Sequence, residues 1–279
     1  MRRPALLLAA LLTATTAQAG DWSDSAIGYR YGNRFAEPYN NRDIGKSILN
    51  LSYAGSTAYG SQFFNVDLLL SDHNDPASAG SGSGAREVYL VYRNTLDLGR
   101  ISGRELRFGP VRGLGLTVGA DLNRKTDAGY NSRKRMLVAG PTLMFDVPGF
   151  FNLSLLALWE SNAPYSTFSN QGVERYYYQT HPMLNAVWGV PLGSTAFNFE
   201  GYANLIAAKG RDEFGGSTAA EANLDLRLMW NAPRNGDGSR LKLGLGYQFW
   251  RNKFGNDHQG AAGKGAFAQT PMLCAEYHF

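Results

Sequence analysis

Hydrophobic and polar residues alternate along most of the chain. Between residues 222 and 230, the sequence ANLDLRLMW places three leucines and Trp230 on one face of an extended chain, and Asn223, Asp225 and Arg227 on the other. Successive side chains of a strand point to opposite sides, so this period of two predicts a strand with one apolar face. The pattern leaves open which face meets water, because soluble sheets and inside-out barrels both use such strands.

The same period recurs about twelve times, and no convincing apolar stripe with the 3.6-residue period of a helix interrupts it. The expected strands cover residues 24–35, 44–54, 59–72, 85–97, 107–124, 134–146, 150–160, 174–190, 195–208, 219–231, 240–252 and 269–279. An even number of antiparallel strands brings the chain back to the side on which it began. We therefore expect both termini at one end of the sheet.

Connections between the expected strands alternate in length. After even-numbered strands they tend to be short, as at 55–58 and 191–193. After odd-numbered strands they are longer and polar, as at 73–84, 161–172 and 253–266. Short turns at one end and long loops at the other are typical of outer-membrane barrels. This pattern predicts that the turns and both termini are periplasmic.

Aromatic residues lie near the ends of the apolar faces. They are Tyr29, Tyr31, Tyr53, Tyr92, Trp159, Trp188, Trp230, Tyr247, Tyr277 and Phe279. Such aromatic girdles are typical of membrane interfaces. Lipid cannot satisfy unpaired backbone groups, so a sheet in lipid must close on itself. We therefore predict an all-β protein, a transmembrane antiparallel up-and-down β-barrel of about 12 strands, with Asp225 and Arg227 facing its interior.

The sequence begins MRRPALLLAALLTATTAQAG. Two arginines precede an apolar run, and small residues at positions 17 and 19 match an A-x-A cleavage site, so residues 1–19 are expected to be a cleaved signal peptide. No linker-like change in composition divides residues 20–279, which we expect to form a single outer-membrane barrel domain. Only one cysteine, Cys274, is present, so the exported chain has to be stable without a disulfide.

Charge and chemistry argue against several classes of function. Without the two leader arginines, the formal net charge of +4 falls to about +2, which does not indicate a nucleic-acid partner. The four histidines are scattered, and no G-x-S-x-G stretch accompanies them. We expect no metal, no cofactor and no enzymatic activity. A barrel hydrolase stays open as a third alternative.

Longer stretches carry more specific information. They are SQFFNVDLLLSDHNDPA (61–77), GAREVYLVYRNTLDLG (84–99), FGPVR (108–112), KRMLVAGPTLMFDVPGF (134–150), HPMLNAVWGVP (181–191), FEGYANLIAAKG (199–210) and AEYHF (275–279). Along essentially the whole mature chain, they resemble the Tsx-like family of nucleoside-specific, channel-forming outer-membrane proteins. The resemblance implies a monomeric barrel that admits nucleosides and deoxynucleosides by passive, saturable diffusion. It also implies phages or bacteriocins as further partners, since some family members are their receptors.

Polar faces opposite the apolar ones supply the expected lining of the lumen. A nucleoside is neutral, with a flat base and a hydroxyl-rich sugar, so a selective passage needs aromatic faces together with charged or amide groups. The candidate lumen residues are Arg30, Arg34, Phe63, Asp67, Glu87, Tyr89, Arg93, Asp121, Asn123, Tyr177, Glu200, Asn204, Asp225, Arg227, Lys242 and Trp250. Mixed charges fit a neutral solute better than an ion filter. Charges that only satisfy one another are the alternative.

Our hypothesis for the lumen has two parts. Phe63, Tyr89 and Trp250 form a base-stacking track, and binding stays weak and spread over several sites so that the ligand can leave. The sugar hydroxyls are bound by three charged side chains, Asp67, Glu87 and Arg93. Other expected partners are outer-membrane lipid, lipopolysaccharide and the outer-membrane assembly machinery. The alternative function is a receptor or adhesion barrel whose lumen is shut and whose extracellular loops bind the partner.

Overall fold

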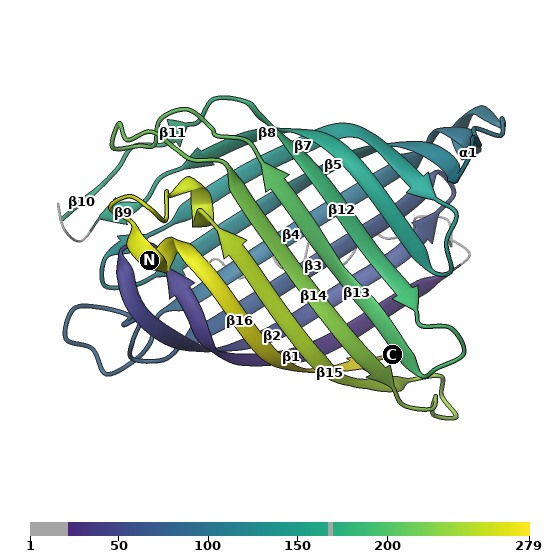
Figure 1. Cartoon of the computed structure of the whole chain (residues 1–279), viewed down its shortest axis with the longest axis horizontal. Helices are drawn as coiled ribbons and strands as arrows, with labels where there is room; N and C mark the ends of the chain where they lie inside the picture. The colour runs from purple at the N-terminus through teal and green to yellow at the C-terminus, as the bar shows by residue number, and fades with distance from the viewer. Residues whose placement is uncertain (1–21, 167–169) are drawn as a thin grey trace, which may run out of the picture.

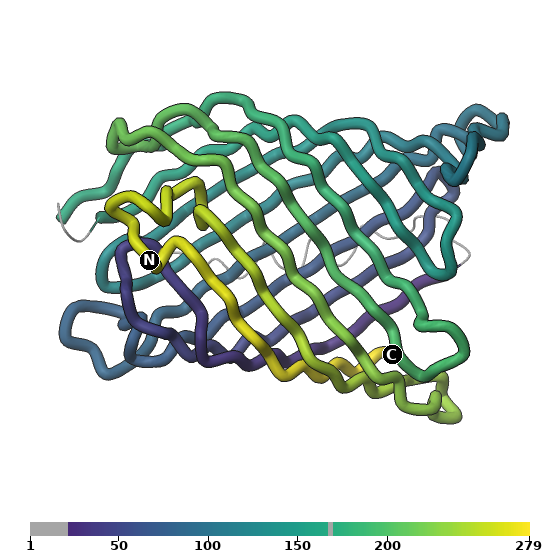
Figure 2. Tube along the Cα trace, in the orientation of Figure 1, coloured from purple at the N-terminus to yellow at the C-terminus, as the bar shows by residue number. Residues whose placement is uncertain are grey.

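The computed structural model describes residues 22–166 and 170–279, in which one closed antiparallel barrel dominates (Figure 1). Its twelve long strands are β1 (Ser23–Glu37), β2 (Asn40–Thr57), β3 (Gly60–Ser71), β4 (Arg86–Asp97), β5 (Val111–Thr126), β7 (Arg133–Phe145), β8 (Phe150–Asn162), β12 (His181–Pro191), β13 (Phe197–Ile206), β14 (Glu221–Asn231), β15 (Arg240–Arg251) and β16 (Phe267–His278). Each pairs with the next, and β16 pairs with β1, which closes the sheet (Figure 2). The predicted fold is confirmed, whereas the expected signal peptide, 1–19, lies outside the described residues.

Short helices and strands lie in the connections at the two ends of the barrel. They are α1 (Leu98–Ser102), β6 (Tyr130–Asn131), β9 (Tyr165–Ser166), β10 (Gln171–Gly172), β11 (Tyr176–Tyr177), η1 (Lys253–Gly255) and η2 (Gly263–Ala266). Asp97 caps α1 by accepting hydrogen bonds from the backbone N–H groups of Gly99 and Arg100. Within the described ranges, no helix is long and apolar enough to span a membrane.

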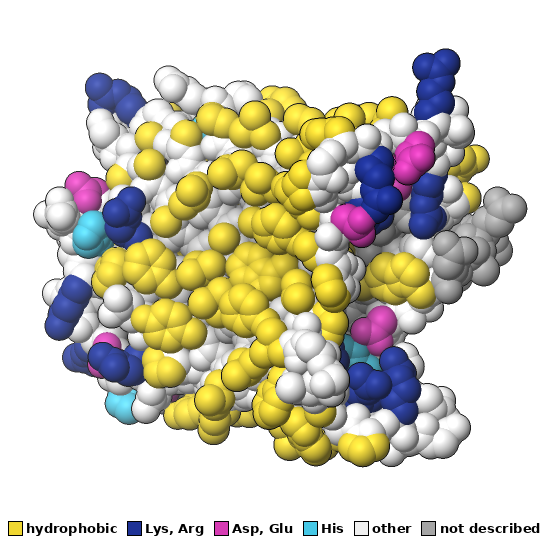
Figure 3. All heavy atoms as spheres, turned by 45° about the vertical axis from the view of Figure 1, so that its right-hand side comes forward, with side chains coloured by type: hydrophobic (Ala, Val, Ile, Leu, Met, Phe, Trp, Pro, Cys, Tyr) yellow, Lys and Arg dark blue, Asp and Glu magenta, His cyan; other side chains and the backbone are white. Residues whose placement is uncertain are grey.

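Burial distinguishes the two faces of the wall. On β14, Leu228 and Trp230 are 42% and 37% exposed, whereas Asp225 is 2% exposed. Alternation in the other strands likewise points Leu, Tyr and Phe outward, and a space-filling view shows hydrophobic side chains over much of the outer surface (Figure 3). Exposed apolar surface of this extent is that of a barrel in a bilayer. The apolar face of 222–230 therefore faces lipid, as predicted.

The two ends of the barrel differ. We call the end that carries α1 the turn end, and the opposite one, with β9, β10 and β11, the loop end (Figure 1). The described chain begins and ends at the turn end, because Ala26 pairs with His278. The described parts of long connections at the loop end cover 163–166, 170–180, 207–220 and 252–266, in line with the expected asymmetry.

Two connections depart from the expected lengths. At the loop end, β1 and β2 were expected to stop at residue 35 and start at 44, but they continue to a two-residue turn at 38–39. Register shifts beyond Gly32 allow this, because each bulge bends the strand and increases its twist. At the turn end, the connection 98–110 is longer than a tight turn and contains α1.

Candidate functional site in the barrel lumen

Strand register places most of the candidate lumen residues inside the barrel. Those that face the lumen are Arg30, Phe63, Asp67, Glu87, Tyr89, Arg93, Asp121, Asn123, Glu200, Asn204, Asp225, Arg227, Lys242 and Trp250. Cross-strand partners point to the same side of the sheet. The inward-facing residues of one strand therefore identify those of the adjacent strand. Whether these residues bind a solute stays a prediction.

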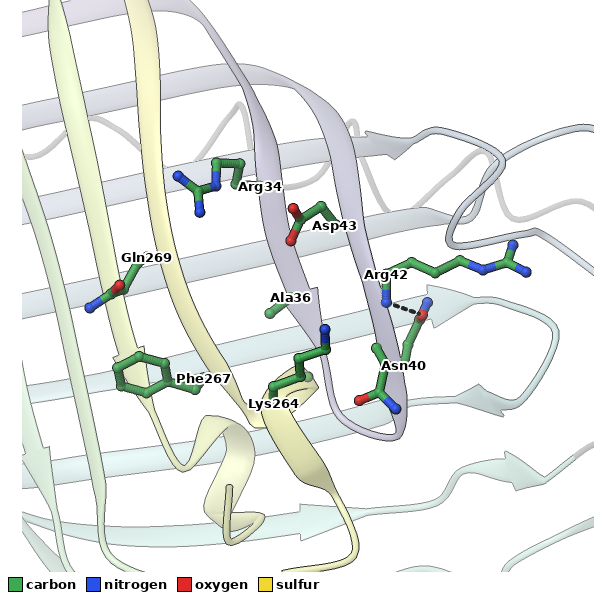
Figure 4. Close-up of a pocket in the computed structure, with 10 residues that line it drawn as sticks. Arg34, Ala36, Asn40, Arg42, Asp43, Lys264, Phe267 and Gln269 are labelled. Carbon is green, nitrogen blue, oxygen red and sulfur yellow. Dashed lines mark hydrogen bonds between the residues drawn. The ribbon is translucent and has the colours of Figure 1, made fainter. Parts of the chain in front are cut away.

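Arg34 does not face the lumen, contrary to the prediction. A register shift between Gly32 and Phe35 turns Phe35 inward, so that Arg34 points out of the barrel. There it lines a pocket of about 170 Å³ on the outer wall, together with Asp43 and Lys264 (Figure 4). Strict alternation along β1 could not reveal this bulge.

Tyr177 also lies outside the lumen. The expected strand 174–190 begins only at His181, and Tyr177 belongs to the short β11, where it pairs with Ser161 on the outer face of β8. It is 72% exposed. Both β11 and β12 pair with β8, but the register shifts by one residue between Tyr177 and His181, which inverts the alternation on which the prediction depended.

Ion pairs cross the middle of the lumen. Arg30 on β1 contacts Asp67 on β3 at 2.6 Å and Asp225 on β14 at 3.3 Å. A single guanidinium therefore links strands that are not neighbours. Arg93 pairs with Asp121, and further round the wall two more such pairs are Arg227 with Glu276 and Lys242 with Glu200. The alternative that lumen charges satisfy one another thus holds for these groups in this structure.

A second set of charges closes the loop end. Three lysines, Lys46, Lys125 and Lys253, lie within 3.4 Å of Glu37 carboxylate oxygens, and all four residues are at most 7% exposed. Burial, opposed by the Glu37 carboxylate, holds the pKa of Lys253 below its usual value. Asp75, from the connection between β3 and β4, contacts Lys125 at 3.0 Å. We call this group of five residues the loop-end seal.

The connection 252–266 folds over the seal. Phe254 adopts the left-handed backbone conformation, with φ of 60°, which is strained for a bulky residue. Its ring lies 4.3 Å from the Lys134 ammonium on β7 and 5.1 Å from that of Lys253. The Trp250 ring packs edge-on against it at 4.8 Å. Cation–π contacts therefore hold this loop across the barrel mouth.

Below the seal, the exposure of lumen-facing side chains differs from strand to strand. Every residue of β3 from 61 to 71 is at least partly exposed, including the inward-facing Phe63, at 41%, and Asp67. On β13, which lies opposite β3 in the strand order, the inward-facing Tyr202 and Asn204 are also partly exposed. The lumen faces of β8 and β16 are mostly buried. Partly exposed lumen-facing side chains are therefore concentrated on β3 and β13.

The hypothesised stacking track is not continuous. Phe63 lies near the turn end of β3, and Tyr89 follows on the adjacent β4, where its register partner is Asp67. Trp250 lies at the loop end of β15 and donates a hydrogen bond to Glu221 at 2.7 Å. It belongs with the seal rather than with the accessible wall.

Sequence reasoning missed several lumen residues. Lys46 faces inward between Ile44 and Ile48, and these neighbours made that face of the segment appear apolar. Tyr202 was overlooked, although alternation on β13 places it with Glu200 and Asn204. No signal in the sequence predicts that 252–266 folds inward. Among the described residues, no cluster of His, Cys, Asp or Glu side chains is arranged to hold a metal ion.

No family model and no curated protein sequence matches the chain, so the resemblance to the Tsx-like family stays an expectation. Solved structures of similar fold include the translocator domain of autotransporter NalP from Neisseria meningitidis, with 12% identity, a TM-score of 0.46, and coverage of 94% of this chain and 90% of that one. OpdK of Pseudomonas aeruginosa, solved with vanillate, has 10% identity and a TM-score of 0.41, covering 92% and 98%. Similarity this low carries no functional argument.

Proposed function

We propose that this protein is an outer-membrane channel for passive, selective diffusion of nucleosides and deoxynucleosides. The observation that carries the proposal is the partly exposed, largely polar lining on β3 and β13, where Phe63 is 41% exposed inside a closed barrel. An aromatic face that stays open to water in a lumen can stack on a base, with about 1–3 kcal/mol per stack. The Phe63 side chain opposes Arg93 in the β3–β4 register, next to groups that bind hydroxyls.

Unsatisfied polar atoms support the choice of a hydroxylated solute. On β14, the buried Asn223 Oδ1 and the buried Arg227 Nε make no hydrogen bond within the described part of the chain, and a solute reaches them only when neighbouring side chains move. One accepts and the other donates, as a sugar hydroxyl requires from its partners. Neighbouring charges of both signs leave no strong net field for an ion, so a neutral polar solute is the best fit.

Orientation and assembly form part of the same proposal. The turn end, where the described chain begins and ends, faces the periplasm, and the loop end faces the exterior. The barrel acts as a monomer without a cofactor and has no enzymatic activity. A solute that enters from outside has to pass the loop-end seal, so transport requires the 252–266 loop to move.

The seal also favours a second candidate function. Lys46, Lys125 and Lys253 are buried against Glu37 at the loop end, and this cluster narrows the entrance to the lumen. A receptor barrel, for example for a phage or a bacteriocin, would need no open lumen. Its partners would meet the long loops 163–180, 207–220 and 252–266.

Single-channel recording in a planar bilayer tests the proposal, with adenosine added on one side and glucose as the control solute. Saturable block by adenosine alone is the expected result. Phe63→Ala should weaken this block about tenfold, because it removes the stacking face. Phe64→Ala is the matched control, since Phe64 precedes Asn65 on the opposite, lipid-facing side of β3. Equal insensitivity to both solutes would reject the nucleoside channel and leave the receptor.

A further inference from the structure

Five arginines gather on the outer wall at the loop end. Arg124 on β5 lies directly opposite Arg133 on β7, and Arg135 follows two residues later on the same face. Arg86 lies diagonally across on β4, beside Arg124. Arg175, from the connection before β11, donates hydrogen bonds to the Arg133 carbonyl at 3.3 Å and to the Ser161 hydroxyl at 3.0 Å. We call these five residues the arginine patch.

The arginine patch has no acidic partner in the described part of the chain. Lumen arginines such as Arg30 and Arg93 each contact a carboxylate, whereas none of the five patch residues forms an ion pair there. Like charges directly opposite each other in a sheet destabilise it. Burial and the nearby Arg135 and Arg133, opposed by Tyr177, lower the pKa of Arg175. The structure therefore concentrates positive charge that only an external anion can neutralise.

Apolar side chains lie directly below the patch on the same wall. Val88, Leu122, Leu137 and Trp159 are between 45% and 59% exposed. Leu122 pairs with Arg135, and Leu137 pairs with Trp159, so these residues follow the arginines toward the middle of the barrel. A ligand that contacts both groups needs an anionic head and hydrocarbon chains.

We propose that the arginine patch binds the phosphate groups of a phosphorylated glycolipid in the leaflet at the loop end, with its acyl chains along Leu122 and Leu137. Guanidinium groups bind phosphate oxygens in a bidentate geometry, which makes arginine better suited than lysine to this role. The apolar residues below the patch select a lipid over a soluble phosphate. The site depends on the membrane position of the barrel and is independent of what the lumen transports.

Native mass spectrometry of the protein in detergent tests this site, with a diphosphorylated lipid A as the probe. The wild-type protein should retain the lipid, and Arg133→Gln combined with Arg135→Gln should bind it about tenfold more weakly, because charge-assisted hydrogen bonds are lost. Arg107→Gln combined with Arg112→Gln removes the same charge near the turn end and should retain the lipid as the wild type does. Circular dichroism checks that each double variant is folded. If a double variant does not fold, the two corresponding single variants are measured instead.

Two further probes identify what is recognised. The wild-type protein and both double variants should bind dephosphorylated lipid A weakly. Inorganic phosphate at the same concentration should not displace the phosphorylated lipid from the wild-type protein. Equal retention of lipid A by the wild type and the Arg133, Arg135 variant would overturn the proposal. Full displacement by inorganic phosphate would also overturn it, because the site would then bind an anion without recognising a lipid.

Discussion

At the scale of single residues, ion pairs in the lumen connect strands that are not adjacent in the sheet. Arg30 contacts carboxylates on β3 and on β14, on either side of its own strand. Its side chain is 13% exposed, and that of Asp225 only 3%. Removing one partner of such a buried pair leaves an uncompensated charge, which is more destabilising than removal of both.

Arg30→Ala should therefore lower the free energy of unfolding by about 3–5 kcal/mol. Adding Asp225→Asn should recover part of this loss, because the stranded carboxylate is neutralised. Urea unfolding in lipid vesicles, followed by tryptophan fluorescence, measures both variants. An equal loss in the single and the double variant would show that Arg30 does not stabilise the barrel through Asp225.

Alternation predicted which residues face the lumen but not which of them would contact each other. Asp67 and Asp225 are far apart in the sequence, and only closure of the barrel brings both to Arg30. Arg34 was misplaced because a bulge of one residue inverts the faces beyond it. A period of two carries no information on such a shift.

At the scale of elements, the strands and the alternation of short and long connections were predictable, but the contacts made by the loops were not. Strands obey a local period, whereas the loops are held by distant groups. Glu213, in the connection 207–220, accepts hydrogen bonds from the hydroxyls of Tyr130 and Tyr178. Burial and the Glu213 carboxylate both raise the pKa of Tyr178 above its usual value of 10.0. The same two causes raise the pKa of Tyr130.

This loop should lose stability in alkaline solution. A raised pKa in the folded state means that the stabilisation is fully present below pH 10.0 and is lost as the pH rises above it. The melting temperature of the barrel with its loops, measured by circular dichroism between pH 8 and pH 11, should fall above about pH 10. Tyr178→Phe cannot ionise and should show a smaller fall. Identical pH profiles would contradict this role for Tyr178.

At the scale of the whole molecule, an accessible lumen and a shut mouth coexist. The seal combines residues from β1, β2 and β5 with the 252–266 loop, so it depends on the closed barrel and on loop placement together. The hydrophobic pattern predicted the closed barrel but gave no signal for the placement of this loop. The sequence predicted most of the residues that face the lumen, and the structure adds the buried charge cluster at its loop end.

Weakening the seal should open the passage. Lys253→Ala combined with Phe254→Ala removes the contacts with Glu37, Trp250 and Lys134, and should raise single-channel conductance in a planar bilayer. Lys264→Ala is the matched control, because Lys264 belongs to the same loop but lines the outer pocket. Unchanged conductance in the double variant, with the barrel still folded, would place the block elsewhere.

The seam between β1 and β16 also determines the order in which the molecule can form. His278 contacts Asp24, 254 positions earlier in the chain, at 2.8 Å. Until β16 arrives, β1 and β15 each present a row of unpaired backbone groups, which lipid cannot satisfy. A chain still being synthesised therefore has no stable form in the membrane. Insertion has to follow completion of the twelfth strand, and folding has to be slow and concerted, as its long-range contacts imply.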